Sequence, residues 1–296
     1  MQLSIPKDYS LEETGITQSL LKKWKTCRRA FLFSINRMHP TCIYEKWAYH
    51  NMMHAALEFL YKGNKMFDVF LTNYKLSVPK DEIQKTKSIA QAMLSRYLEF
   101  YGKDFTEKRF TAVEKEFAVR FGNYLLRGKC DGKFKDKKGR FYHIEHKNYS
   151  QINVEVLAKI LKFDLQNNFY ALADSIEGKR DIHGVLYNVL RVPQSRKEIS
   201  PRDLLVELSE KIRKDPKHYF FRFEIMFHPS DLKDFEGTLR HQLSELYACL
   251  HTGVHCFYQN ENACQLRGTC EYLDICSSGS FVGYEKIDTF FPELEE

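Results

Sequence analysis

Residues 126–148, LRGKCDGKFKDKKGRFYHIEHKN, carry the clearest structural signal in the chain. The segments 124–134 and 141–148 alternate between apolar and polar side chains, which is typical of β-strands. Between them, KDKKG at 135–139 is a polar turn that contains a glycine. The stretch therefore predicts a β-hairpin with its turn near Lys137.

The hairpin carries three ionisable side chains that the predicted pairing brings together. Asp131 lies on the first strand, and Glu145 and Lys147 lie on the second. Residues two apart in a strand point to the same face, and a turn near Lys137 sets Asp131 opposite Glu145. Close carboxylates repel, so one binds a proton unless a cation compensates the charge. Mg²⁺ suits such a pair, whereas the alternative is a solvated hairpin with an ordinary Glu–Lys pair.

Helices are expected on both sides of this hairpin. Helical spacing is present at residues 16–35, 45–61, 84–101, 154–174 and 232–250, with Thr17 as the first N-cap. Further strands are expected at 112–121, 181–191 and 219–227. The polar stretch 193–218 reads as a surface excursion. This order predicts an α/β fold, with a central mixed β-sheet flanked by helices.

The composition is that of a globular protein with a mildly basic balance. The chain has 296 residues, enough for one large core, and a net charge of +6 that suits a polyanionic partner. It contains no run of about 18 apolar residues, and residues 1–15 lack the pattern of a signal peptide. We therefore expect a cytoplasmic protein with no membrane span. Eight cysteines in such a protein favour metal ligation over a disulfide framework.

Two parts of the hairpin resemble the core motif of the PD-(D/E)XK nucleases. Residues 128–131, GKCD, followed by 144–147, IEHK, match the pattern G-x-x-D … hydrophobic-(D/E)-x-K. More narrowly, the chain is similar to the branch that holds the RecB and AddB nucleases and the CRISPR-associated exonucleases. That branch carries a helical His upstream and a Q-x-x-x-Y helix downstream. His54 in HNMMHAALEFLY, and Gln166 with Tyr170 in LQNNFY, occur here in the same order.

The resemblance covers residues 17–276 and implies a restriction-endonuclease-like core in a single nuclease domain over 1–296. The expected parts are an N-terminal helical part (17–110), a catalytic core (111–191), a sheet extension and helix (192–250), and a Cys-rich cluster region (251–296). The implied reaction is hydrolysis of DNA, single-stranded or at ends, as an exonuclease in recombination, repair or CRISPR-adaptation-like processing. No G-x-x-x-x-G-K-[ST] motif is present, so unwinding is left to a helicase, recombinase or integrase partner.

The resemblance also implies a set of ligands for Mg²⁺ or Mn²⁺. They are the side chains of His54, Asp131 and Glu145 and the main-chain carbonyl of His146. His50 lies one helical turn before His54, so a zinc pair H-x-x-x-H is an alternative use of this helix.

Further residues are expected to act beside the metal ligands. Lys147 positions or helps to deprotonate the attacking water and stabilises the transition state. Gln166 and Tyr170 are four residues apart on one helical face, and they support the site and the DNA backbone. Glu114 or Glu116, on the strand before the hairpin, adds an outer contact to the metal site.

The cysteines form a spaced run near the end of the chain. Cys264, Cys270 and Cys276 are separated by five residues each, which is not the usual zinc spacing. Three thiolates with a distant fourth suit a [4Fe–4S] cluster. The iron–sulfur members of the branch place one Cys before the core and three after it, which implies Cys27 as the fourth ligand. Cys256 is an alternative ligand to Cys264, and the other cysteines are read as packing residues: Cys42, Cys130 and Cys249.

Two rival functions stay open at this point. One is a non-catalytic DNA-binding or assembly module with a structural cluster, and the other is a nuclease stapled by zinc without iron. A basic run in the first helix is read either as a phosphate track or as a solvated face: Lys22, Lys23, Lys25, Arg28 and Arg29.

Overall fold

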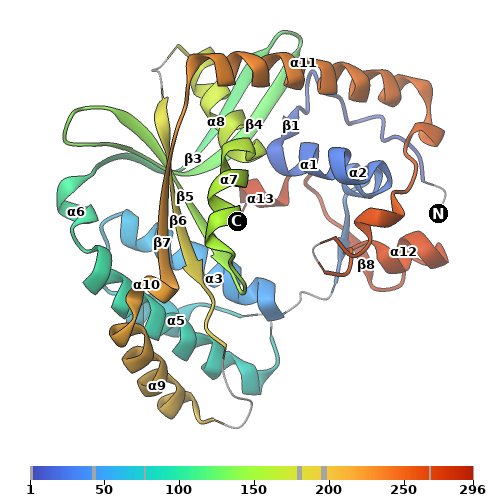
Figure 1. Cartoon of the computed structure of the whole chain (residues 1–296). Coiled ribbons are helices and arrows are strands. Elements are labelled where there is room, and N and C mark those ends of the chain that lie inside the picture. The colour runs from blue at the N-terminus through green and yellow to red at the C-terminus, as the bar shows by residue number, and fades with distance from the viewer. Residues whose placement is uncertain are drawn as a thin grey trace.

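A mixed six-stranded β-sheet forms the centre of the protein (Figure 1). The computed structural model describes residues 3–41, 45–76, 78–178, 182–194, 199–266 and 268–295, without the side chains of 45–47 and 81. The strand order is β1 (Ile16–Thr17), β4 (Tyr124–Lys135), β5 (Phe141–Tyr149), β6 (Ile182–Arg191) and β7 (Phe220–Met226), and β3 (Arg109–Phe121) also pairs with β4. The β1–β4 and β5–β6 pairs are parallel and the others antiparallel, so the predicted α/β fold with a mixed sheet is confirmed.

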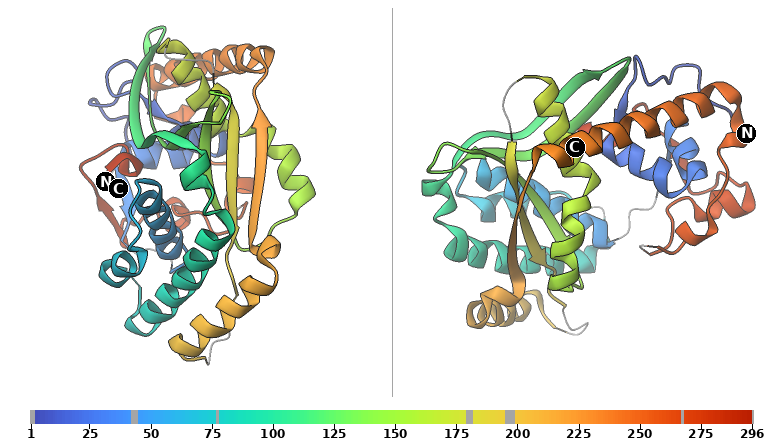
Figure 2. Two further views of the ribbon diagram at one scale, coloured as in Figure 1. Left: turned by 90° about the vertical axis from the view of Figure 1, so that its left-hand side faces the viewer. Right: turned by 45° about the horizontal axis from the view of Figure 1, so that its top comes forward.

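Two hydrophobic clusters join the helices to the sheet. One cluster packs α3 (Glu45–Tyr61), α4 (Phe67–Asn73), α5 (Lys80–Tyr101) and α9 (Pro201–Lys214) against Phe134, Tyr142 and Ile144 of the hairpin. The other joins α1 (Gln18–Thr26), α2 (Arg28–Ile35), α8 (Leu165–Ile176) and α11 (Pro229–Thr252) around Leu126 and Cys130 of β4. Figure 2 shows α11 reaching from the sheet to the N-terminal helices. Of the helices described, none is both long and apolar enough to span a bilayer.

The C-terminal tail folds back onto the N-terminal segment. β2 (Met38–Pro40) and β8 (Tyr284–Lys286) form a separate antiparallel pair. Before β8, α12 (Leu273–Ser278) follows Tyr272, whose hydroxyl donates to the Met38 carbonyl at 3.2 Å. After β8, α13 (Pro292–Glu295) brings Glu293 to β1, where the Thr17 hydroxyl donates to its carboxylate at 2.5 Å. The two ends of the described chain are therefore bound to each other and to the sheet.

The prediction of one continuous helix over residues 16–35 is wrong. The segment starts with β1 and then divides into α1 and α2. Cys27 separates the two helices because its backbone is extended, with φ −156° and ψ 115°. The predicted N-cap is confirmed, since the Thr17 hydroxyl accepts from the Leu20 N–H at 3.2 Å.

The surface excursion predicted at 193–218 is also wrong. Most of it forms α9 and the short α10 (Pro216–Tyr219), because Leu204, Leu208 and Ile212 recur at helical spacing and are buried on α5 and the sheet. The helix predicted at 154–174 is divided into α7 (Val154–Ile160), a 3₁₀ turn (Leu161–Phe163) and α8. Residue 181, the predicted start of β6, lies outside the described residues.

Candidate functional site

The two hairpin carboxylates lie where the regular β-ladder ends. β4 and β5 pair antiparallel as far as Gly132 and Ile144, one step before the carboxylates. One residue further, the same register sets Asp131 against Glu145, as the sequence predicts. Here the strand contact changes in kind, because the His146 N–H donates to the Asp131 carboxylate at 2.7 Å. Beyond the last ladder pair, the carboxylates of Asp131 and Glu145 are therefore bound by the His146 N–H and by the Lys147 ammonium.

Lys147 is the cation nearest to these carboxylates. Its ammonium donates to Glu145 at 2.5 Å and to the side-chain carbonyl of Gln166 at 2.6 Å. Burial and then the charge of Asp131 raise the pKa of Glu145, and burial and then Glu114 raise the pKa of Asp131. One ammonium therefore does not offset two buried carboxylates, and the folded protein resists ionising both of them.

This charge imbalance suits a divalent cation. Oε2 of Glu145 is buried and, among the described residues, has no hydrogen-bond partner. A buried acceptor without a partner costs about 1–3 kcal/mol, and carboxylate oxygens are the ligands that Mg²⁺ prefers. In the described part of the chain, no three His, Cys, Asp or Glu side chains already form a complete metal site. The residues fit a metal in the chemistry of their donor atoms.

His54 approaches the same carboxylates from α3. Its Nδ1 lies 3.9 Å from the Asp131 carboxylate. Burial and then the charge of Lys147 lower the pKa of His54 to about 4, so the imidazole is neutral at pH 7. A neutral imidazole is the form that binds metals. His50, the other member of the alternative zinc pair, packs edge-on against the Tyr49 ring at 5.9 Å and is not among the residues that line the cleft around His54.

The site opens into a cleft of about 560 Å³. Its walls come from β1, α3, β4, α8 and the C-terminal α13, which supplies Glu293 and Leu294. Glu114 lines this cleft at 3.5 Å from the Lys129 ammonium, and burial is the main cause that raises its pKa to about 7. Glu116 lines a separate hollow, so the structure separates the two carboxylates that the sequence left as alternatives. Nothing in the sequence points to Glu293, because its place depends on the folding back of the tail.

α8 presents polar side chains to the sheet at four-residue intervals. Gln166 accepts from Lys147 and donates to the Tyr170 hydroxyl at 3.4 Å. One turn further on, the Asp174 carboxylate binds His143 of β5 at 2.8 Å and forms an ion pair with Lys133 of β4. Asp174 is a residue that sequence analysis missed, although it continues the spacing of Gln166 and Tyr170. Its contacts with His143 and Lys133 bind the C-terminal end of α8 to the sheet, which helps to hold Gln166 in its hydrogen bond with Lys147.

We expect Asp174→Asn to lower the free energy of unfolding by about 2 kcal/mol at pH 7. Burial opposes ionisation of Asp174, but the hydrogen bond from His143 and the charge of Lys133 outweigh it and lower its pKa. A lowered carboxyl pKa stabilises the fold above the ordinary value of 3.8, and this stabilisation is lost as the pH falls through the folded-state pKa. Urea unfolding at pH 7 and pH 3 should show the gap between variant and wild type closing at pH 3.

Asp136→Asn is the matched control for this prediction. Asp136 pairs with Arg140 in the exposed hairpin turn, where solvent screens the ion pair, so this variant should change the free energy of unfolding little. A gap between Asp174→Asn and wild type that is equal at pH 7 and pH 3 would contradict the role assigned to the Asp174 charge.

The four cysteines of the predicted cluster lie in one region. Cys27 stands at the junction of α1 and α2, and main-chain bonds tie this junction to the tail, such as Arg29 N–H to the Tyr258 carbonyl at 3.1 Å. The Cys270 N–H donates to the Cys264 carbonyl at 2.9 Å. Burial is the main cause that raises the pKa of Cys270 and of Cys276, and the charges of Cys27 and Cys264 raise both further. The thiols of Cys27 and Cys264 are therefore close enough to those of Cys270 and Cys276 to raise the pKa of both.

Cys256 lies in a different environment from these four. Its thiol lies beside that of Cys249, where burial is the main cause that raises the Cys249 pKa and Cys256 raises it further. The Arg28 guanidinium donates to the Cys249 sulfur at 3.6 Å on the same side. Cys130 lies on β4 with its side chain buried in the core, and Cys42 lies outside the described residues. This arrangement favours Cys264 over Cys256 as the companion of Cys270.

Two members of the basic run bind the tail instead of lining the cleft. Lys23 forms an ion pair with Glu271 at 2.8 Å, and Arg28 forms one with Glu245 of α11. Arg28 also lies over the Trp24 ring at 4.3 Å. For these two residues the phosphate-track interpretation is wrong, because Lys23 on α1 and Arg28 at the start of α2 are paired with carboxylates of the tail and of α11.

The comparisons with known proteins point to one family. A model described as the PD-(D/E)XK nuclease superfamily matches residues 16–277. No curated protein matches the chain. Among solved structures, the crystal structure of SSO0001 is similar at 13% sequence identity, covering 67% of this chain and 84% of that chain with a TM-score of 0.23. That structural likeness is too low to carry an argument.

Proposed function

The chain belongs to the PD-(D/E)XK nuclease superfamily, and on that basis we propose that it is a Mg²⁺- or Mn²⁺-dependent deoxyribonuclease that acts on single strands or DNA ends. The observation that carries the proposal is the meeting of Asp131, Glu145 and Lys147 at the end of the β4–β5 ladder. Two buried carboxylates with one ammonium form a poor structural ion pair but a suitable metal and phosphate site.

In this proposal the metal would be held by Asp131, Glu145, His54 and the main-chain carbonyl of His146. When bound, it neutralises charge on the phosphate and makes a bound water more acidic. Lys147, held by Glu145 and Gln166, keeps its ammonium beside the reacting phosphate and stabilises the charge that develops there. Tyr170 supports Gln166 from the next turn of α8.

The cleft supports a strand or a strand end as the substrate. Its volume of about 560 Å³ lies within the range of small-ligand sites, which suits part of one strand better than a duplex. The net charge of +6 agrees with a polyanionic substrate. We place the activity in recombination, repair or CRISPR-adaptation-like processing, as in the RecB and AddB nucleases and the CRISPR-associated exonucleases, with a helicase, recombinase or integrase partner. We further propose that residues 1–296 act as one nuclease domain.

We also propose a [4Fe–4S] cluster on Cys27, Cys264, Cys270 and Cys276. Its support is the rise that Cys27 and Cys264 cause in the pKa of Cys270 and Cys276, and the main-chain bonds between the α1–α2 junction and the tail. Such a cluster closes a loop around the nuclease core, because Cys27 precedes Cys264 by 237 positions (264 − 27 = 237). Iron and zinc analysis of anaerobically purified protein separates this proposal from a zinc staple.

The activity is tested by incubating end-labelled single-stranded and double-stranded DNA with Mg²⁺, Mn²⁺ or EDTA. We expect cleavage only with a metal, and binding that weakens with salt and shows little sequence preference, because backbone contacts carry no base information. Binding without cleavage in either metal would favour the non-catalytic DNA-binding module. Cleavage at one duplex sequence, independent of ends, would contradict a processing exonuclease.

A further inference from the structure

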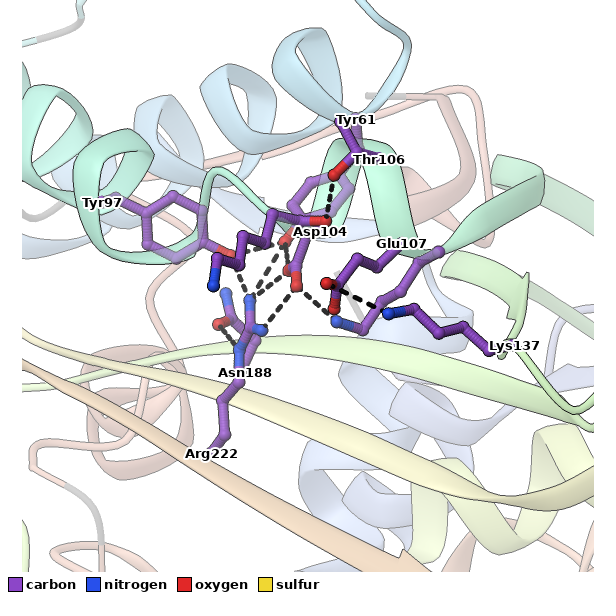
Figure 3. Close-up of polar contacts among 10 residues, drawn as sticks. Tyr61, Tyr97, Asp104, Thr106, Glu107, Lys137, Asn188 and Arg222 are labelled. Atoms are coloured by element: carbon purple, nitrogen blue, oxygen red, sulfur yellow. Dashed lines mark hydrogen bonds and ion pairs between the residues drawn. The ribbon is translucent and has the colours of Figure 1, made fainter.

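A buried charge network lies behind the hairpin, on the side of α5 and α6 (Asp104–Glu107) (Figure 3). Arg222 of β7 binds both oxygens of Asp104, which is 3% exposed, and one of these bonds measures 2.9 Å. The same guanidinium donates to the Tyr97 hydroxyl at 3.0 Å, and the Tyr61 hydroxyl donates to Asp104 at 3.0 Å. The Arg222 guanidinium also lies 3.5 Å from the centre of the Tyr101 ring. These contacts hold the guanidinium in one orientation.

The network continues from Arg222 to the hairpin through Asn188. The Arg222 Nε–H donates to Asn188 Oδ1 at 3.1 Å, and Asn188 Nδ2 lies 2.9 Å from His146 Nδ1. Arginine can only donate hydrogen bonds, so the carbonyl of Asn188 must face Arg222 and its NH₂ must face His146. His146 Nδ1 is then an acceptor, and the ring proton lies on Nε2. Asn188 is fully buried and His146 is 3% exposed, so water does not compete for these bonds.

His146 lies between Glu145 and Lys147 on β5 and contacts Asp131 on β4. Its main-chain N–H donates to Asp131 at 2.7 Å. Its ring packs against Tyr61 with ring centres 5.1 Å apart and against His54 at 6.4 Å. Because the His146 ring is hydrogen-bonded at Nδ1 and packed on Tyr61, the main chain at His146 has little freedom to move. The orientation of the Asp131 carboxylate therefore depends on how the His146 ring is held.

We propose that Arg222 and Asn188 are positioning residues of the active site, and that they hold His146 as the neutral tautomer with its proton on Nε2. This inference rests on the proposed nuclease function. Through His146 they fix the peptide that orients Asp131 and presents its carbonyl to the metal. Neither ring nitrogen of His146 is then free to bind a metal, which leaves the main chain as its contribution.

The tautomer is tested by ¹⁵N NMR of His146 in the metal-free protein. We expect the wild type to carry the proton on Nε2. In Asn188→Asp, whose carboxylate can only accept, we expect the proton on Nδ1. Mn²⁺ affinity, measured by electron paramagnetic resonance without DNA, should weaken about 10- to 100-fold in Asn188→Asp and in Arg222→Lys, because lysine lacks the Nε–H that holds Asn188.

Glu107→Gln is the matched control for these variants. It breaks the Glu107–Lys137 ion pair of 3.2 Å, which is drawn in Figure 3 but is more exposed to solvent and makes no contact with Asn188. This variant should keep wild-type Mn²⁺ affinity and the Nε2 proton.

A wild-type His146 proton on Nδ1 would overturn the inference, and so would wild-type Mn²⁺ affinity in folded Asn188→Asp and Arg222→Lys. If Asn188→Asp does not fold, Arg222→Lys and the wild-type spectrum still decide the matter. A wild type that binds no Mn²⁺ and cleaves no DNA would instead contradict the proposed function, whatever the tautomer.

Discussion

Glu145→Gln is expected to abolish DNA cleavage while making the metal-free protein more stable. The substitution keeps the shape of the side chain but removes the buried carboxylate of Glu145, which faces the carboxylate of Asp131. Loss of a proposed metal ligand should lower kcat on the order of 10³-fold. Removal of an uncompensated buried charge should raise the free energy of unfolding on the order of 1 kcal/mol. Steady-state cleavage and urea unfolding in EDTA measure the two effects.

The opposite signs of these effects separate catalysis from folding. Asp131→Asn and Lys147→Ala should also abolish cleavage, but Lys147→Ala should destabilise the protein because it removes the ammonium that faces Glu145. Glu116→Gln is the matched control, since Glu116 lies on β3 outside the cleft and should leave cleavage and stability unchanged. Wild-type turnover of Glu145→Gln or Lys147→Ala, with both Mg²⁺ and Mn²⁺, would contradict the assignment.

Thermal stabilisation by Mg²⁺ tests the same site independently of cleavage. A ligand that binds only the folded state stabilises it in proportion to the logarithm of its concentration. Mg²⁺ should therefore raise the melting temperature of the wild type and have little effect on Glu145→Gln.

The hairpin was predictable because its information is local. Alternation with period two sets the strand faces, and a short turn sets the register, so Asp131 and Glu145 follow from the spacing alone. Helical spacing places Gln166 and Tyr170 on one face, but their place at the site was implied by the family resemblance. The break at Cys27 was not predictable, since the apolar residues of α1 and α2 continue one helical pattern across an extended residue.

The network behind the hairpin was not predictable for the opposite reason. Asp104 and Arg222 are 118 positions apart. Asp104 stands in a charged stretch that is typical of a solvated surface, and Arg222 alternates with aromatic residues on a predicted strand that does not reveal its partner. Only the pairing of β6 with β7 brings Arg222 next to Asn188. α9 was missed for a related reason, because polar residues flank the three that it buries, Leu204, Leu208 and Ile212.

The cysteine panel has the second large expected effect. We expect Cys27→Ala, Cys264→Ala, Cys270→Ala and Cys276→Ala each to lose iron and the brown absorbance, and to melt at a lower temperature. Closing a long loop restricts the unfolded chain, by roughly 4–5 kcal/mol for a covalent crosslink at the greatest lengths. Binding of the cluster adds to this, because the unfolded chain has no preformed site. Iron per chain and thermal melting after anaerobic purification measure both effects.

Cys256→Ala and Cys249→Ala are the matched controls, because these two thiols lie together beside Arg28 and should leave the iron content unchanged. Cys130→Ala should also keep its iron, although removal of a buried side chain will lower its stability slightly. Full iron in Cys27→Ala would show that the cluster does not join the two ends of the core. Iron loss in Cys256→Ala with full iron in Cys264→Ala would exchange the two ligands. Zinc in place of iron would keep the staple and change its chemistry. None of the four cysteines lines the cleft that holds Asp131, so each cysteine variant should lose cleavage only as far as it loses its fold.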